Sequence, residues 1–247
     1  MAPNRQTPAR AGPARMADPL PRQLSLGLTL PDAMTRADFM EAPSNALALS
    51  AIEDPDGLPA GKLVLTGPPG AGKTHLLRIW CQRHAAREVA PHDLPRDLRV
   101  LLGLPRGACV AIDDAQALAG RAEAEEALFH LHNHLARHDG ALLLTARGPV
   151  RDWGLTLPDL ASRLMAAAHV ALAPPDDALL AAVLVKLFND RQIRVQPALI
   201  DYLLSRMERS LAAARQTVAR LDAMALARGT SVNRKLAQSL FAEEAPR

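Results

Sequence analysis

Eight consecutive residues carry the clearest chemical signal in this chain, because they follow the pattern Gly-x4-Gly-Lys-Thr. They are Gly67, Pro68, Pro69, Gly70, Ala71, Gly72, Lys73 and Thr74. Glycines let backbone N–H groups close around phosphate oxygens, and a helix that follows directs its positive end at the same anion. The lysine of such a loop reaches the β- and γ-phosphates, and the threonine hydroxyl is offered to Mg2+. The segment therefore predicts a phosphate-binding P-loop rather than an ordinary glycine turn.

The residues on either side supply the elements that such a loop requires. The apolar run 63–65 precedes the loop and predicts a buried strand, while residues 75–81 predict a helix. We include His75, the first residue of that run, among the residues that contact the nucleotide.

A second strand has to deliver carboxylates to a P-loop, and residues 109–114 fit that requirement. The apolar run Cys-Val-Ala-Ile ends in Asp113 and Asp114. Asp113 is placed to hold Mg2+, directly or through water, and Asp114 stands where an acid would orient the attacking water. The alternative is that both acids only cap the next helix.

Apolar runs alternate with helical patterns between residues 32 and 174, which is typical of a parallel α/β sheet with crossover helices. We predict strands at 63–66, 109–112, 141–145 and 169–172, and a further one near 98–101. Beyond Pro174-Pro175 the pattern becomes helical throughout. Asp176 is a candidate N-cap, and we predict a small all-helical domain over residues 176–247.

Composition limits the classes of partner and compartment. The net charge is +3, and residues 1–22 hold four arginines against one aspartate, so the rest of the chain is close to neutral. This argues against a large duplex-binding surface, although the tail could contact nucleic acid weakly. Residues 1–22 have too few large apolar side chains to order themselves, and we predict a disordered tail. With no membrane-length apolar run, no signal peptide and two cysteines, the sequence predicts a cytoplasmic protein.

Several motifs together resemble one family, the DnaA-related AAA+ ATPases, over the chain from Gln23 to the C-terminus. Residues 112–116 match that family's second nucleotide motif, and residues 157–164 match the stretch that carries its arginine finger. Within the family the chain is most similar to the Hda subfamily, small homologues that promote regulatory inactivation of the initiator DnaA. The resemblance implies a P-loop AAA+ module, with a parallel sheet and flanking helices, and a small C-terminal all-helical lid.

The resemblance also assigns roles and cofactors. Arg163 stands at the arginine-finger position, and Arg209 aligns with the lid arginine, sensor 2, that contacts bound nucleotide. Residues 39–45 resemble the segment that flanks the adenine pocket. ADP or ATP and Mg2+ are the implied cofactors. Each arginine also has a plainer interpretation, as a solvated surface side chain.

The chain departs from the family at Arg147, where relatives carry an acidic residue. A cation does not orient water as an acid does, so we expect nucleotide binding with weak intrinsic ATPase activity. A salt bridge between Arg147 and one of the acids, Asp113 or Asp114, is the corresponding structural hypothesis.

A short peptide between the tail and the folded part is similar to the sliding-clamp-binding motif Gln-Leu-Ser-Leu-Pro-Leu. Its residues are Gln23, Leu24, Ser25, Leu26, Gly27 and Leu28. The glutamine amide can hydrogen-bond at a pocket rim, and the leucines can anchor in an apolar groove. Glycine in place of proline reduces preorganisation. The alternative is that the peptide is an edge strand or the first apolar segment of the core.

The resemblance implies a regulator of replication initiation in the bacterial cytoplasm, associated with the replisome and nucleoid. Its expected partners are DnaA and the β subunit sliding clamp of DNA polymerase III, and a homodimer is left open. We expect no origin recognition, because the DNA-binding domain that follows the lid in DnaA is missing. One alternative is an autonomous AAA+ ATPase that loads or remodels another replication protein. Another is a nucleotide-gated scaffold without catalysis.

Two clusters resemble sites but favour plainer interpretations. The four histidines at 130, 132, 134 and 138 have no acidic or cysteine partner at a suitable spacing, so we predict no metal site. The acidic run Glu123, Glu125 and Glu126 is expected to be the solvated first turn of a helix.

Overall fold

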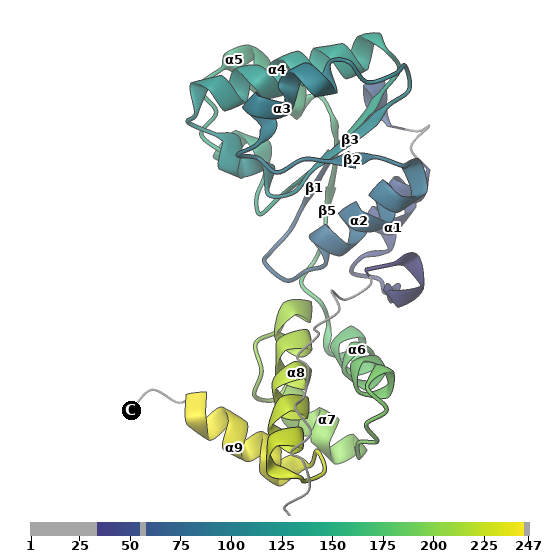
Figure 1. Ribbon diagram of the computed structural model, residues 1–247, viewed down its shortest axis with the longest axis vertical. Coiled ribbons are helices and arrows are strands. Elements are labelled where there is room, and N and C mark those ends of the chain that lie inside the picture. Colours follow the sequence, from purple (N-terminus) through teal and green to yellow (C-terminus); the bar gives the residue numbers. More distant parts are fainter. Residues whose placement is uncertain (1–33, 55–57, 245–247) are drawn as a thin grey trace, which may run out of the picture. The chain divides into compact units, whose positions relative to one another are not determined.

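The computed structural model describes residues 34–54 and 58–244, and these form a parallel sheet with helices on both faces, followed by a helical lid (Figure 1). The predicted α/β fold with flanking helices and a helical lid is confirmed. The tail 1–22 and the peptide at residues 23–28 lie outside the described residues. Among the described residues, no helix has both the length and the apolar character needed to cross a bilayer.

In the sheet, a single strand lies between the strand that precedes the P-loop and the strand that ends in Asp113 and Asp114. Its five parallel strands have the order β2-β3-β4-β1-β5. They are β1 (Lys62–Thr66), β2 (Arg87–Glu88), β3 (Cys109–Ile112), β4 (Ala141–Ala146) and β5 (Ala168–Ala171). In the register, Leu65 pairs with Thr145 and Ile112 pairs with Leu144. The carboxyl ends of β1, β3 and β4 therefore meet at one edge, where the P-loop begins.

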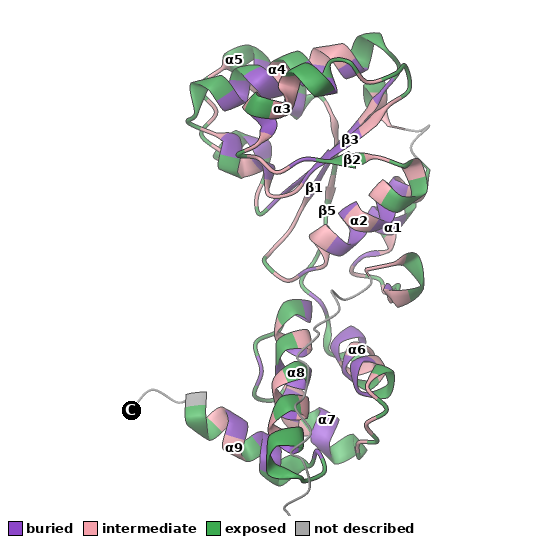
Figure 2. Cartoon of the chain, in the orientation of Figure 1, coloured by how far each residue is buried: buried purple, intermediate pink, exposed green. Residues whose placement is uncertain are grey.

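Helices cover both faces of the sheet, which explains why its central strands β1, β3 and β4 read as nearly continuous apolar runs. The helices are α1 (Ala46–Glu53), α2 (Lys73–His84), α3 (Leu94–Leu101), α4 (Ala122–Arg137) and α5 (Pro158–Met165). Leu142 and Leu144 of β4 pack in one cluster with α3, α4 and α5, whereas Leu143 packs in the other with α1 and α2. Figure 2 shows buried segments on the strands of the sheet and on the helices that flank it.

One predicted strand is wrong, and one strand was missed. Residues 98–101 form the end of helix α3, because Leu94, Leu98 and Leu101 recur at helical spacing and pack on α4. Pro95 in the first turn suits a helix start, where its missing N–H is not needed. The edge strand β2 is only two exposed residues long, so it leaves no apolar run to detect.

The lid has its own core, made by four helices. They are α6 (Asp177–Asp190), α7 (Pro197–Leu204), α8 (Leu211–Arg228) and α9 (Arg234–Glu244). Phe188, Leu203 and Val218 are fully buried among them. The predicted cap is present, since an Asp176 carboxylate oxygen accepts the Leu179 N–H at 2.7 Å. At the start of α8, the Ser210 hydroxyl accepts the Ala213 N–H in the same way.

Candidate nucleotide-binding site

The lid packs directly on the glycine-rich loop. Gly70 has φ +72°, and a Cβ there would lie 2.5 Å from the Cβ of Ser210. The Leu211 N–H donates to the Gly70 carbonyl at 2.9 Å. Glycine at this position therefore serves both a left-handed backbone conformation and the close approach of the first turn of α8.

Lys73 opens α2 and lies within the loop that it follows. Its ammonium donates to the carbonyl oxygens of Gly67 at 2.7 Å and Pro68 at 2.9 Å. Burial lowers the pKa of Lys73, and the nearby Asp113 and Asp114 oppose that shift. The ammonium is thus held at the loop by acceptors that a phosphate oxygen could replace.

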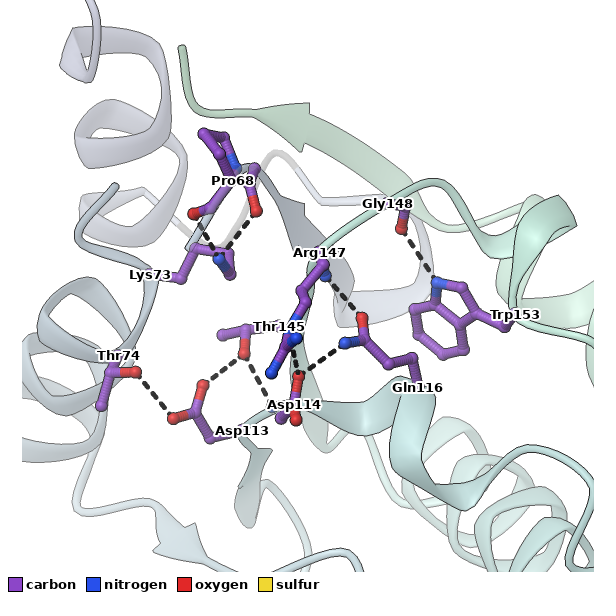
Figure 3. A network of polar contacts seen from close by, with 11 residues as sticks. Pro68, Lys73, Thr74, Asp113, Asp114, Gln116, Thr145, Arg147, Gly148 and Trp153 are labelled. Carbon is purple, nitrogen blue, oxygen red and sulfur yellow. Dashed lines mark hydrogen bonds and ion pairs between the residues drawn. The ribbon is translucent and has the colours of Figure 1, made fainter. Parts of the chain in front are cut away.

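The Asp113 carboxylate accepts hydrogen bonds from two hydroxyl groups, one at the start of α2 and one near the end of β4. Thr74 Oγ1 donates to Asp113 Oδ2 at 2.7 Å, and the Thr145 hydroxyl donates to Asp113 Oδ1 (Figure 3). The Thr145 oxygen in turn accepts the Asp114 N–H at 2.9 Å. Hydroxyl and carboxylate oxygens are the ligands that Mg2+ prefers, so Thr74 and Asp113 suit a magnesium ion beside the loop.

Asp114 is held by two groups that lie beside it. Gln116 donates from Nε2 to Asp114 Oδ1 at 2.7 Å, and its own Oε1 accepts the backbone N–H of Arg147 at 2.5 Å. Arg147 Nε lies 3.7 Å from the same Asp114 oxygen. The hypothesised salt bridge between Arg147 and an acid is therefore present, and its partner is Asp114 (Figure 3). Asp114 also has φ +54°, an unusual backbone conformation for a residue other than glycine.

A pocket of about 240 Å³ lies between the loop and the lid. The loop side is formed by Gly70, Gly72, Lys73, Thr74 and His75, and the lid side includes Leu211, Ala212 and Arg215.

Arg209, the expected lid arginine, is not among the residues that line this pocket. It is 68% exposed and pairs with Asp177 at 3.0 Å. Arg215, six residues further along the chain, lines the pocket instead. Arg215 was not predicted from the sequence, although its place in the second turn of α8 is a signal that could have suggested it.

His75 joins three segments at this pocket. Its Nε2 lies 2.9 Å from the Thr35 carbonyl, and its Nδ1 lies 3.1 Å from the guanidinium of Arg215. Burial lowers the pKa of His75, and Arg215 lowers it further. A neutral imidazole that carries its proton on Nε2 satisfies both contacts. The edge of the Phe39 ring packs against it, with centroids 5.2 Å apart, so the predicted segment 39–45 begins beside the loop.

Arg163 lies away from this pocket, on the exposed side of α5. Its guanidinium carbon lies 5.2 Å from the centre of the Phe129 ring on α4. The structure therefore does not bring Arg163 to the loop of its own chain.

The start of α5 is fixed by Glu125. In the acidic run that was expected to be solvated, Glu123 and Glu126 are exposed, but Glu125 is not. Glu125 is fully buried. Its carboxylate accepts N–H groups from Gly120 at 2.7 Å, Thr156 at 2.9 Å and Leu157 at 2.8 Å, and also the Thr156 hydroxyl. Burial raises its pKa, but these hydrogen bonds outweigh burial and hold the pKa below the usual value. Glu125 thus ties α4 to the first turn of the helix that carries Arg163.

No protein-family model matches the chain. Among solved structures, it is similar to domain III of the replication initiation protein DnaA from Thermotoga maritima, with a TM-score of 0.75 and 20% identity over 88% of this chain and 99% of that one. AMPPCP-bound DnaA from Aquifex aeolicus gives a TM-score of 0.65 and 18% identity over 78% and 66%. A RuvB variant from Thermotoga maritima gives 0.60 and 20% over 78% and 64%. The fold is that of a P-loop AAA+ module.

Proposed function

We propose that this protein is a regulator of replication initiation of the Hda type. In this proposal it binds ADP or ATP with Mg2+ at its P-loop and is held at DNA-loaded sliding clamps by residues 23–28. It then docks on ATP-bound DnaA in the bacterial cytoplasm and supplies Arg163 to the initiator's active site. The likeness of its fold to DnaA structures supports the choice of partner.

The observation that carries the proposal is the position of Arg163. This arginine is exposed, belongs to a helix anchored by the buried Glu125, and does not line its own chain's pocket. A guanidinium held in this way can contact a nucleotide bound to a neighbouring molecule more readily than one bound at the P-loop of its own chain. Phe129 beneath it restricts its motion through a cation–π contact.

The chemistry follows from charge that develops during phosphoryl transfer. When the terminal phosphoryl group leaves ATP, negative charge spreads over its oxygens and the leaving group. A guanidinium supplied by a neighbour stabilises that charge and accelerates hydrolysis by about 10³–10⁵. This corresponds to about 4–7 kcal/mol of transition-state stabilisation.

The chain's own nucleotide site has a binding role in this proposal. Lys73 and the loop N–H groups would hold the phosphates, and Arg215 would approach them from the lid. Mg2+, when held by Thr74 and Asp113, offsets phosphate charge. Since Asp114 is engaged by Gln116 and Arg147, we expect weak intrinsic hydrolysis.

The clamp tether rests on the peptide Gln23, Leu24, Ser25, Leu26 and Leu28, which lies outside the described residues. Each leucine that enters an apolar groove contributes about 1.5–3 kcal/mol, so the expected affinity is moderate. Replacing Gln23 and Leu26 with alanine should abolish capture on a clamp column, and undiminished capture would remove this part of the proposal.

An autonomous AAA+ ATPase is the second candidate, and one observation favours it. Lys73, Thr74 and Asp113 are already assembled around the loop as hydrolysis in cis would require. This candidate predicts substantial ATPase activity of the isolated chain and no need for Gln23.

The deciding experiment is single-turnover hydrolysis of DnaA-bound ATP in the presence of clamp loaded on DNA. Wild-type protein should stimulate hydrolysis, and Arg163→Ala should reduce the stimulated rate by at least about 10³. Arg151→Ala is the matched control, because it removes an exposed arginine that pairs only with its neighbour Asp152 in the described contacts. Equal stimulation by wild type and Arg163→Ala would refute the finger assignment. No stimulation by wild type would favour the autonomous ATPase.

A further inference from the structure

A groove of about 720 Å³ runs along the C-terminal half of α4 and shares no lining residue with the pocket at the P-loop. Every ionisable side chain that lines it is a nitrogen base, and the remaining polar one is an amide. They are His130, Asn133, His134, Arg137, His138 and Arg163. The four-histidine pattern of the sequence thus contributes three members to one concave surface, whereas His132 is buried elsewhere in the helix packing.

Aromatic and stacking contacts hold several of these groups in place. The rings of His134 and His138 stack with centroids 4.2 Å apart, and His138 Nδ1 lies 2.8 Å from the His134 carbonyl. Phe129 meets the His130 ring at 5.8 Å and supports the Arg163 guanidinium at 5.2 Å. Guanidinium groups and aromatic or imidazole rings therefore line the groove together.

Two simpler explanations account for only part of the arrangement. Basic residues at the end of α4 would complement the helix dipole, but the partial charge there is only about half an elementary charge. Two guanidinium groups exceed it, and Arg163 belongs to a different helix. A metal site is not supported either, because no three potential ligands converge in residues 34–54 and 58–244.

We propose that this groove binds a nucleoside polyphosphate, in addition to the nucleotide expected at the P-loop. Guanidinium groups form strong charge-assisted hydrogen bonds with phosphate oxygens, and aromatic or imidazole rings offer faces on which a base can stack. The Asn133 amide can both donate to and accept from a base edge. The volume lies within the range of about 300–1,000 Å³ that is usual for small-molecule sites.

Occupancy of this groove has a consequence for Arg163. The same guanidinium lines the groove and is the finger in the proposed function, so a bound nucleotide and a docked partner would compete for it. The binding itself does not depend on that function, because it is a property of the chain alone.

The test is equilibrium binding of ADP to the full-length protein without any partner. We expect about two ADP per chain for wild type and about one for Lys73→Ala, in which the P-loop site is removed. In the Lys73→Ala background, His134→Ala with Arg137→Ala should weaken the remaining site at least tenfold. Arg228→Ala, which removes an exposed lid arginine, should leave it unchanged. All these substitutions lie on the surface or at the loop, and a thermal melt checks that each variant is folded.

The imidazole NMR signals provide a second, direct readout. In Lys73→Ala, added ADP should shift the signals of His130, His134 and His138 but leave the signal of His84, which does not line the groove, unchanged. A stoichiometry of one for wild type and none for Lys73→Ala would overturn the proposal. Equal binding of inorganic tripolyphosphate, or of a poly-glutamate peptide, would overturn the assignment to a nucleoside polyphosphate.

Discussion

Removing the Arg147 side chain should release Asp114 only in part. The ion pair is 3.7 Å long, and its members are 65% and 48% exposed. Exposed pairs of this kind contribute at most about 1 kcal/mol. Arg147 also holds Gln116 through its backbone N–H, which alanine retains, so Gln116 should stay hydrogen-bonded to Asp114 in the variant.

This geometry sets the size of the expected effect. A change of about 1 kcal/mol alters a population about fivefold, so the fraction of molecules with Asp114 released should rise by no more than that. If release of Asp114 limits intrinsic hydrolysis, Arg147→Ala should hydrolyse its own ATP about two- to fivefold faster than wild type. Its free energy of unfolding should change by less than about 1 kcal/mol.

The assay is single-turnover hydrolysis of radiolabelled ATP by the isolated chain. Arg151→Ala is the control, since it removes an arginine that is 78% exposed and pairs with Asp152 at the same 3.7 Å distance. A second variant, Gln116→Ala combined with Arg147→Ala, removes both contacts to Asp114 and should be faster than either single variant. A slower Arg147→Ala would show that the arginine supports hydrolysis. A gain well above tenfold would show that it inhibits by more than holding Asp114.

Three further changes test other parts of the structure. Arg215→Ala should weaken ADP binding about tenfold, as measured by calorimetry, because Arg215 lines the pocket. Arg209→Ala should leave the affinity nearly unchanged, because Arg209 pairs with Asp177 and does not line the pocket. A larger loss for Arg209→Ala than for Arg215→Ala would support Arg209 as the lid arginine that contacts the nucleotide. Glu125→Ala removes a buried carboxylate that accepts three backbone N–H groups and should lower the free energy of unfolding in urea by about 2–4 kcal/mol, and a change below 1 kcal/mol would contradict this account. Burial lowers the pKa of His132 to about 4, so between pH 6.5 and 4 the unfolded chain takes up more protons than the folded one. Stability should therefore fall by up to about 3 kcal/mol as the pH drops through that range, and His132→Leu should lack this component in acid unfolding curves.

The sequence was sufficient for the features that depend on local pattern. Four of the five strands, the helix after the P-loop and the Asp176 cap follow from apolar runs and capping residues, and the structure confirms them. Residues 98–101 were predicted as a strand because a four-residue segment with three apolar side chains suits either a strand or a helix, and only the packing of α3 on α4 decides between them.

Long-range contacts could not be read from the sequence. Glu125 looked like any acid in the first turn of a helix, and its burial depends on N–H groups that lie 31 and 32 residues later. Arg215 lines the pocket and Arg209 does not, and this depends on which face of α8 meets the loop. Gln116 lies only two residues from Asp114, but its contact with the backbone N–H of Arg147 depends on β4 lying beside β3.

The hydrogen bonds of the His75 imidazole make the attachment of the lid to α2 sensitive to acid. A neutral ring has one donor and one acceptor, and both are already committed, to Thr35 and Arg215. A second proton would have to sit on Nδ1, where it would face the N–H groups of Arg215 and turn an attraction into a repulsion. Both ring nitrogens of His75 are thus already hydrogen-bonded. Protonation of the ring would break its contact with Arg215 and so weaken the attachment of the lid to the helix that begins with Lys73, while the hydrogen bond to Thr35 would remain.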